Sequence, residues 1–134
     1  MKRLHLLVGA LVVVAFLLTG QYMDYLDVRS GALGETARAM FRSRHIYLLM
    51  AGLVNLCVGA YFAYRARGWR RSLQLAGSVF VLAAPALMLA AFFTEPPAPG
   101  LKRQFTLPAV SILAAGAVLH ALSGLKSGAK SGAD

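Results

Sequence analysis

Two histidines near opposite ends of this chain have the side chains and the spacing to hold a cofactor. His5 lies near the start of the first long apolar run, and His120 lies near the end of the last one. If these runs are the first and last helices of an antiparallel bundle, the two imidazoles lie at similar depth on neighbouring helices. Such a pair could bind the iron of haem b. The structural alternative is that His5 reaches the headgroups from the helix start, while His120 hydrogen-bonds to Ser78 or Gln74.

A second group of polar residues, which we call the outer polar cluster, gathers at the other end of the same runs. It consists of Arg42, Arg44, His45, Glu95 and Arg103. Because Glu95 ends the third run, an ion pair with Arg42, Arg44 or His45 would neutralise a charge beside the hydrocarbon. One interpretation is a structural clasp, with Arg44 and Arg103 at lipid phosphates. The other is an outward-facing pocket for a small anion, a lipid headgroup or a partner loop, and with Asn55 the same residues could serve a small transporter.

Other chemistries lack the residues that they need. No Asp or Glu lies in the middle of any apolar run, where proton-coupled transporters normally carry one. The sequence shows no nucleophile–base pair at helical spacing, so we predict no catalytic residue. Cys57 is the only cysteine, and we expect it to be a small buried hydrophobe. No carboxylate or thiolate accompanies His5 and His120 at their depth, so we predict no metal site.

Four apolar runs must position these side chains. They cover residues 4–20, 46–64, 72–94 and 105–125, each close to the roughly 20 residues that a helix needs to cross a bilayer. In lipid every backbone polar group must be paired within its segment, so the runs are helices. The sequence therefore predicts an all-α polytopic membrane protein with a four-transmembrane-helix antiparallel bundle in one domain, residues 1–125. Residues 126–134 are predicted to form a disordered cytoplasmic tail, and Lys2 and Arg3 to precede a retained first span.

Each run collects its small and polar residues on one helical stripe. These residues are His5, Gly9 and Thr19 in the first run, His45, Gly52, Asn55 and Gly59 in the second, Gln74, Gly77, Ser78 and Pro85 in the third, and Gly116 and His120 in the fourth. Small residues let helix backbones approach, and polar groups bond across helices instead of facing hydrocarbon, so we expect these stripes to face each other. Asn55, Gln74 and Ser78 are the intramembrane polar residues. We expect Asn55 to bond to a backbone carbonyl left free near Pro85.

The basic residues orient the chain in the membrane. The link between the second and third runs contains Arg65, Arg67, Arg70 and Arg71 and no acid, which is typical of a cytoplasmic loop. Both termini fall on that side of a four-span protein. The net charge of +9 is then explained by flanking residues that meet anionic lipid. We predict no nucleic-acid binding, since no nucleic-acid recognition motif is present.

Three strings of residues carry a resemblance to a known group of proteins. They are Leu18–Met23 (LTGQYM), Phe41–Leu49 (FRSRHIYLL) and Leu53–Leu56 (LVNL). With them the first half of the chain resembles a group of small bacterial inner-membrane proteins that have no assigned activity. The resemblance implies four spans and a bacterial membrane, and it supplies no catalytic residues.

These observations predict a small non-enzymatic component of a bacterial cytoplasmic membrane. Its expected partners are membrane lipid and either other membrane subunits or further copies of itself. No cofactor is required by this hypothesis. The alternatives are a b-type haem protein that uses His5 and His120, and a small transporter or anion binder.

Overall fold

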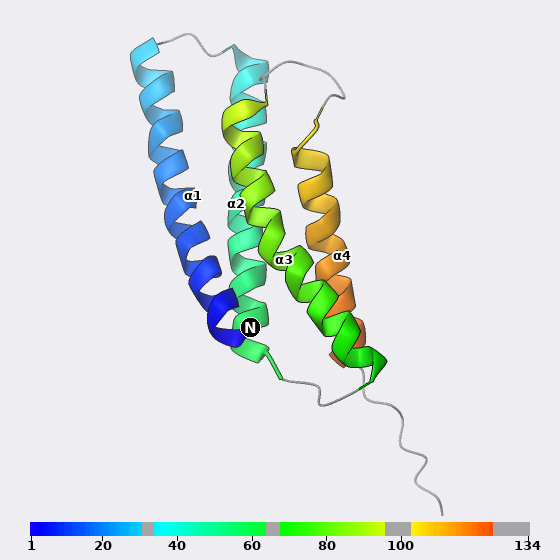
Figure 1. Ribbon diagram of the computed structural model, residues 1–134. Coiled ribbons are helices and arrows are strands. Elements are labelled where there is room, and N and C mark those ends of the chain that lie inside the picture. The colour runs from blue at the N-terminus through cyan, green and yellow to red at the C-terminus, as the bar shows by residue number, and fades with distance from the viewer. Residues whose placement is uncertain (31–33, 64–67, 96–102, 125–134) are drawn as a thin grey trace, which may run out of the picture.

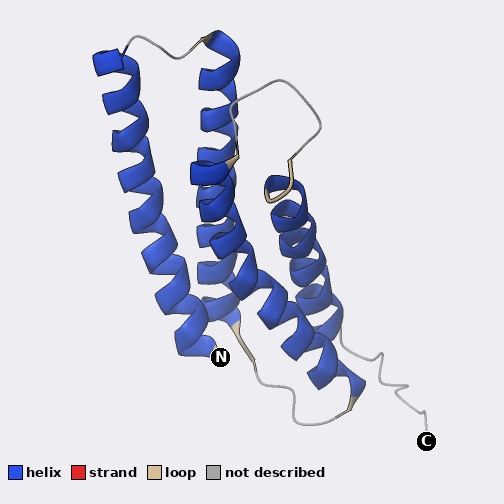
Figure 2. Cartoon of the chain, turned by 45° about the horizontal axis from the view of Figure 1, so that its top comes forward, coloured by secondary structure: helices blue, strands red, loops and turns tan. Residues whose placement is uncertain are grey.

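The protein is a bundle of four α-helices. The computed structural model describes residues 1–30, 34–63, 68–95 and 103–124, and these residues contain no strand. The helices are α1 (Lys2–Ser30), α2 (Glu35–Tyr61), α3 (Trp69–Thr94) and α4 (Thr106–Gly124), and successive helices run in opposite directions (Figure 1). The prediction of an all-α chain is confirmed (Figure 2).

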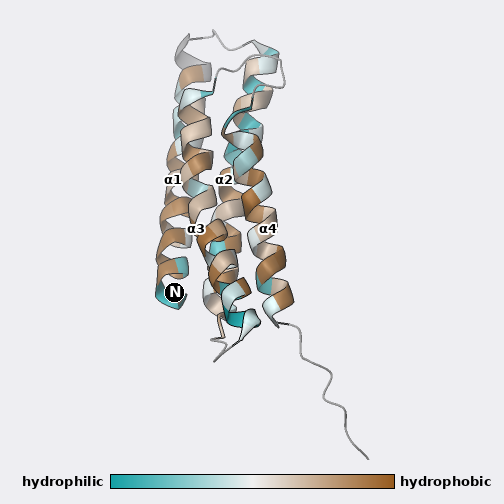
Figure 3. Ribbon diagram, turned by 45° about the vertical axis from the view of Figure 1, so that its right-hand side comes forward, coloured by the Kyte–Doolittle hydropathy of each residue, from teal (hydrophilic) through white to brown (hydrophobic). Residues whose placement is uncertain are grey.

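All four helices are long and apolar enough to cross a membrane. Hydrophobic residues dominate the middle of each helix, and hydrophilic residues are concentrated toward the helix ends (Figure 3). α1 continues well past residue 20 to Ser30, and α2 begins at Glu35, before its apolar part. The predicted bounds of the third and fourth runs agree closely with α3 and α4. The predicted tail, 126–134, lies outside the described residues.

The bundle consists of two tight helical hairpins. α1 packs closely on α2, and α3 packs closely on α4, whereas α2 and α3 share a smaller contact between the hairpins. Among the described residues, no backbone positions of α1 and α4 come within contact distance. The expectation that the first and last helices are neighbours is therefore wrong, because α2 and α3 lie between them (Figure 1).

Glycines allow the close approach within each hairpin. A Cβ atom on Gly9 would lie 2.8 Å from the backbone nitrogen of Leu56 in the first hairpin. In the second hairpin, a Cβ atom on Gly77 would lie 2.9 Å from the backbone oxygen of Gly116. Side chains cannot yield at these points because the obstacle is backbone. Backbone contact of this kind supplies the van der Waals packing that holds helices together where lipid competes for apolar surface.

The predicted stripes are confirmed as the packed faces. The buried positions include His5 and Gly9 of α1, Gly52 and Asn55 of α2, Gln74 to Pro85 at helical spacing on α3, and Ala109, Leu113 and Gly116 of α4. Cys57 contradicts its prediction, since its side chain is exposed rather than buried. It lies two residues after Asn55, about 200° around the helix, so it faces away from the packed stripe.

Substitution of Gly77 tests the hairpin packing. Gly77→Ala should destabilise the protein by about 1–3 kcal/mol, because its Cβ atom forces α3 and α4 apart. Gly34→Ala is the matched control, since nothing lies within 4 Å of a Cβ atom there, and it should leave stability nearly unchanged. Unfolding of both variants in detergent, followed by circular dichroism, measures the difference. Equal stability of the two variants would contradict the packing described here.

Candidate functional site

A proline in α3 creates the first polar contact of the bundle interior. Pro85 has no backbone N–H, so the carbonyl of Val81, four residues earlier, receives no helical hydrogen bond from it. Asn55 of α2 fills this place, because its Nδ2 donates to the Val81 oxygen at 2.9 Å. The prediction that Asn55 bonds to a carbonyl near Pro85 is confirmed. α2 and α3 are thereby joined at one depth of the bundle.

The same amide determines the state of His5. Asn55 Nδ2 also donates to the backbone oxygen of Ala51 at 3.0 Å, so both of its protons face carbonyl acceptors. Its Oδ1 therefore faces Nδ1 of His5, 2.9 Å away, and can only accept. His5 must carry its proton on Nδ1, which leaves a lone pair on Nε2. His5 is fully buried, and within the described part of the chain Nε2 has no hydrogen-bond partner.

His120 lies beside this lone pair. The imidazole rings of His5 and His120 have their centroids 5.9 Å apart and their planes at 84°. The ring of Phe62 lies 5.9 Å from each of them. Although α1 and α4 are not neighbours, their side chains meet in the space between the hairpins. The expectation that His5 reaches the headgroups is wrong, because the ring turns inward and is covered on every side.

Two predicted polar residues complete this end of the bundle. Ser78 of α3 is fully buried, and its Oγ lies 3.0 Å from Nε2 of His120, as one prediction proposed. Gln74, one helical turn earlier on α3, donates from Nε2 to the backbone oxygen of Ala63 at 2.7 Å. A cavity of about 290 Å³ lies beside His120, and Gln74 also lines it. We call His5, Asn55, Ser78 and His120 the histidine site.

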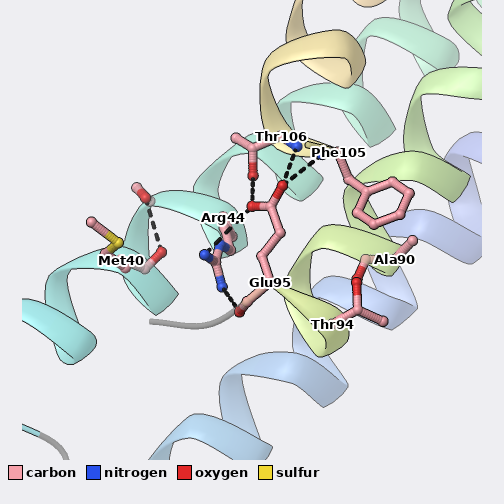
Figure 4. Close-up of polar contacts among 8 residues, drawn as sticks. Met40, Arg44, Ala90, Thr94, Glu95, Phe105 and Thr106 are labelled. Atoms are coloured by element: carbon pink, nitrogen blue, oxygen red, sulfur yellow. Dashed lines mark hydrogen bonds and ion pairs between the residues drawn. The ribbon is translucent and has the colours of Figure 1, made fainter. Parts of the chain in front are cut away.

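At the opposite end of the bundle, Glu95 holds the start of α4. Its Oε1 accepts hydrogen bonds from the backbone N–H groups of Phe105 at 2.6 Å and Thr106 at 2.9 Å. Its Oε2 accepts from the hydroxyl of Thr106 at 2.6 Å (Figure 4). The first N–H groups of a helix have no partner within the helix and carry a partial positive charge. A carboxylate from the end of α3 therefore caps α4.

Arg44 closes the arrangement from α2. Its Nη1 donates to the backbone oxygen of Glu95 at 2.7 Å, and its Nη2 lies 3.4 Å from Oε2 of Glu95. Both residues are about 95% buried, so the pair is shielded from solvent. We call Arg44, Glu95 and Thr106 the clasp. Of the three partners considered for Glu95, the structure selects Arg44, and burial of Arg44 excludes the predicted contact with lipid phosphate.

The other members of the outer polar cluster do not join the clasp. Arg42 is exposed, and Arg103 is half-buried. His45 lies on the α1–α2 contact, where its Nδ1 is 3.0 Å from Oγ1 of Thr19. Its ring stacks on Phe16 at a centroid distance of 4.0 Å. The five residues of the cluster are therefore divided between a buried clasp, a separate α1–α2 contact and the surface.

The surroundings of Glu95 keep it ionised. Burial raises the pKa of this carboxyl, but the hydrogen bonds from Thr106 and Phe105 and the charge of Arg44 together lower it more. The pKa therefore lies below the usual glutamate value. The ionised form is the one that accepts all three hydrogen bonds and pairs with Arg44.

Sequence reasoning assigned no partner to three residues that complete these sites. Thr106 joins the clasp, Thr19 holds His45, and Phe62 covers both histidine rings. Thr106 had a usable signal, since a threonine at the start of an apolar run is a common helix beginning. Phe62 had none, because its position depends on how α2 ends.

Comparison of the chain with protein families, with curated proteins and with solved structures gives no match. Interpretation of the two sites therefore depends on their own geometry.

The link between Pro85 and Asn55 can be tested by a double-mutant cycle. Asn55→Leu should cost about 1–3 kcal/mol, because it leaves the Val81 carbonyl and the Nδ1–H of His5 without partners. In a Pro85→Ala background the new backbone N–H can bond to the carbonyl of Val81. Asn55→Leu should then lower the free energy of unfolding by measurably less. Ser43→Ala is the control on α2, since among the described residues its hydroxyl bonds only to the backbone oxygen of Met40 in the same helix. The free energy of unfolding in detergent is measured for each variant. An equal loss from Asn55→Leu in both backgrounds would refute the link between Pro85 and Asn55.

The clasp predicts a pH dependence of stability. Because the folded pKa of Glu95 lies below its unfolded value, its stabilising contribution is complete above the unfolded pKa. The contribution is lost as the pH falls below about 4.3 and through the lower folded pKa. Glu95→Gln should lower stability at pH 7 by about 1–3 kcal/mol and flatten the acid side of the stability curve.

The exposed Glu35 supplies the charge-matched control for this experiment. Glu35→Gln changes net charge equally but should preserve the acid dependence of the wild type. Thermal unfolding midpoints in detergent between pH 7 and pH 3 compare the three proteins. An unaltered acid dependence in Glu95→Gln would show that the clasp does not control it.

Proposed function

We propose that this protein is a small non-enzymatic component of a bacterial cytoplasmic membrane and that it works by binding a ligand at the histidine site. The outer polar cluster then serves structure. In a membrane the protein acts as an accessory subunit or as a self-associating bundle, with lipid around its four helices. The following contacts support this proposal.

The observation that carries the proposal is the contrast between the two ends of the bundle. At the clasp, both oxygens of Glu95 accept hydrogen bonds and Arg44 pairs with it inside the protein. At the histidine site, the fully buried Nε2 of His5 has a lone pair and no partner among the described residues. A buried polar atom without a partner costs about 1–3 kcal/mol. A ligand that uses this atom recovers the cost, whereas no buried side-chain atom described at the clasp lacks a partner.

The charge distribution supports an orientation with the histidine site toward the cytoplasm. Arg70 and Arg71, at the start of α3, lie at the same end of the bundle as His5 and His120. Positive residues flank the cytoplasmic ends of membrane helices. The start of α1 and the end of α4 share that end. The bacterial origin in this proposal comes from the resemblance of the first half of the chain.

A b-type haem protein is the second candidate, and one observation favours it. His5 has the arrangement of a metal-ligating imidazole, since its Nδ1–H is held by an amide oxygen and its Nε2 is available. His120 fits less well, because its Nε2 is engaged with Ser78. Haem would supply a redox-active iron to the bundle, and His5 would be its better-prepared ligand.

The transporter alternative gains no support from the geometry. Its residues Arg42, His45, Asn55 and Glu95 lie in separate places rather than around one pathway. Glu95 belongs to the clasp, His45 contacts Thr19, and Asn55 contacts His5.

Native mass spectrometry of the purified protein tests the proposal. Wild-type protein released from detergent should retain a small molecule above its 14.3 kDa polypeptide mass. His5→Ala should lose that molecule, while His45→Ala, which removes an imidazole at the other end of the α1–α2 pair, should keep it. The proposal fails if both variants retain it equally, or if the reconstituted wild type shows turnover or substrate flux without a partner. A visible spectrum of the same sample after haem supplementation decides the second candidate, since a missing Soret band excludes haem b.

A further inference from the structure

An apolar groove runs along the outside of the bundle between α2 and α4. It encloses about 570 Å³ and is lined by Ile46, Leu53, Val54 and further apolar residues of α2, with Ala117 of α4 opposite. The groove shares Cys57 and Val58 with the cavity beside His120. The two spaces therefore adjoin along α2, and we call the cavity beside His120 the chamber.

The polar chamber presents flat rings and uncharged polar groups. Tyr61 and Phe62 line it from the end of α2, and His120 and Ser123 line it from α4. None of the described residues that line it is charged. Tyr61 is 87% exposed, as expected of an aromatic residue at a membrane–water boundary. The chamber thus suits a planar, neutral head at the edge of the hydrocarbon.

The hydrogen bonds of His120 determine which polar group a ligand head in the chamber must have. Ser78 is fully buried, and within the described chain its hydroxyl has one acceptor in reach, Nε2 of His120. Ser78 therefore donates to Nε2, and His120 carries its proton on Nδ1. The Nε2 and Cδ2 edge of the ring faces Ser78 and Gly77 on α3. The opposite edge, with the Nδ1–H donor, is turned away from α3 and needs an acceptor such as a carbonyl oxygen.

We propose that the groove and the chamber bind an isoprenoid quinone. The isoprenoid chain lies in the apolar groove along α2, and the quinone ring enters the chamber between the rings of Phe62 and Tyr61. A quinone carbonyl accepts the Nδ1–H of His120.

The neutral head of a quinone distinguishes this ligand from an ordinary phospholipid. A phospholipid head carries an anionic phosphate, which favours arginine or lysine side chains with several N–H donors. The described lining of the chamber offers imidazole, hydroxyl and amide groups instead. This inference rests on the proposed function of the histidine site as a binding site, and it specifies the chemical class of the ligand.

Photolabelling of the full chain in nanodiscs tests the inference. The probe is an azido-substituted ubiquinone with a short isoprenoid tail, in discs of phosphatidylcholine. Label should concentrate on the peptides that contain Tyr61 and Phe62 and those that contain His120 and Ser123. An excess of unmodified quinone should reduce it several-fold.

Two variants and one control define the outcome. Ala117→Phe fills the groove from its surface, and His120→Phe keeps a ring but removes the N–H donor, so each should reduce labelling several-fold. Leu11→Phe, on the exposed face of α1, should leave it unchanged. Should His120→Phe fail to fold, Ala117→Phe decides alone, because that side chain is not in the packed interior.

Three results would overturn the inference. They are label spread evenly over the exposed helix faces, label that unmodified quinone does not compete, and label that phosphatidylglycerol displaces, which would indicate an anionic lipid site. If labelling fails while His5→Ala still releases a different molecule in native mass spectrometry, only the quinone assignment is lost and the binding function stands.

Discussion

The bond between Asn55 and the carbonyl that Pro85 leaves free is the interaction on which the bundle interior depends. It joins the two hairpins, which share less contact with each other than the helices share within each hairpin. It also fixes the amide so that its oxygen must face His5, which fixes the proton of that imidazole. One missing N–H on α3 therefore determines the chemical state of a side chain on α1. Polar groups in hydrocarbon require partners, so this chain of contacts has little freedom to rearrange.

The two ends of the bundle use buried polar groups in opposite ways. At the clasp, Glu95 accepts two backbone N–H groups and the Thr106 hydroxyl, and the result is a helix cap supplied by the end of another helix. Every buried side-chain atom described at the clasp has a partner. At the histidine site the matching is incomplete by one lone pair, and a cavity lies alongside. Incomplete matching is costly in a packed interior, so the lone pair of His5 needs an explanation, which a bound molecule would supply.

Much of this arrangement could be predicted from the sequence, because helical spacing determines which side chains share a face. The stripes that contain Gly9, Asn55, Gly77 and Gly116 follow from that spacing, and so does the need of Asn55 for a carbonyl near Pro85. The choice of Arg44 over Arg42 could not be predicted, since both lie within one turn of α2 and only the rotation of α2 separates them. The separation of α1 from α4 also depends on how the hairpins are set against each other. Spacing along one helix carries no information about that offset.

The division into hairpins has a consequence for how the chain reaches its folded form. Asn55 keeps two of its three hydrogen bonds, those to Ala51 and His5, inside the first hairpin. Before α3 is synthesised, one amide proton of Asn55 therefore has no hydrogen-bond partner. The carbonyl of Val81, synthesised later, also lacks a hydrogen-bond partner. The two groups can bond only when the second hairpin packs on the first in one position. Pro85 and Asn55 thus determine together where the second hairpin docks on the first.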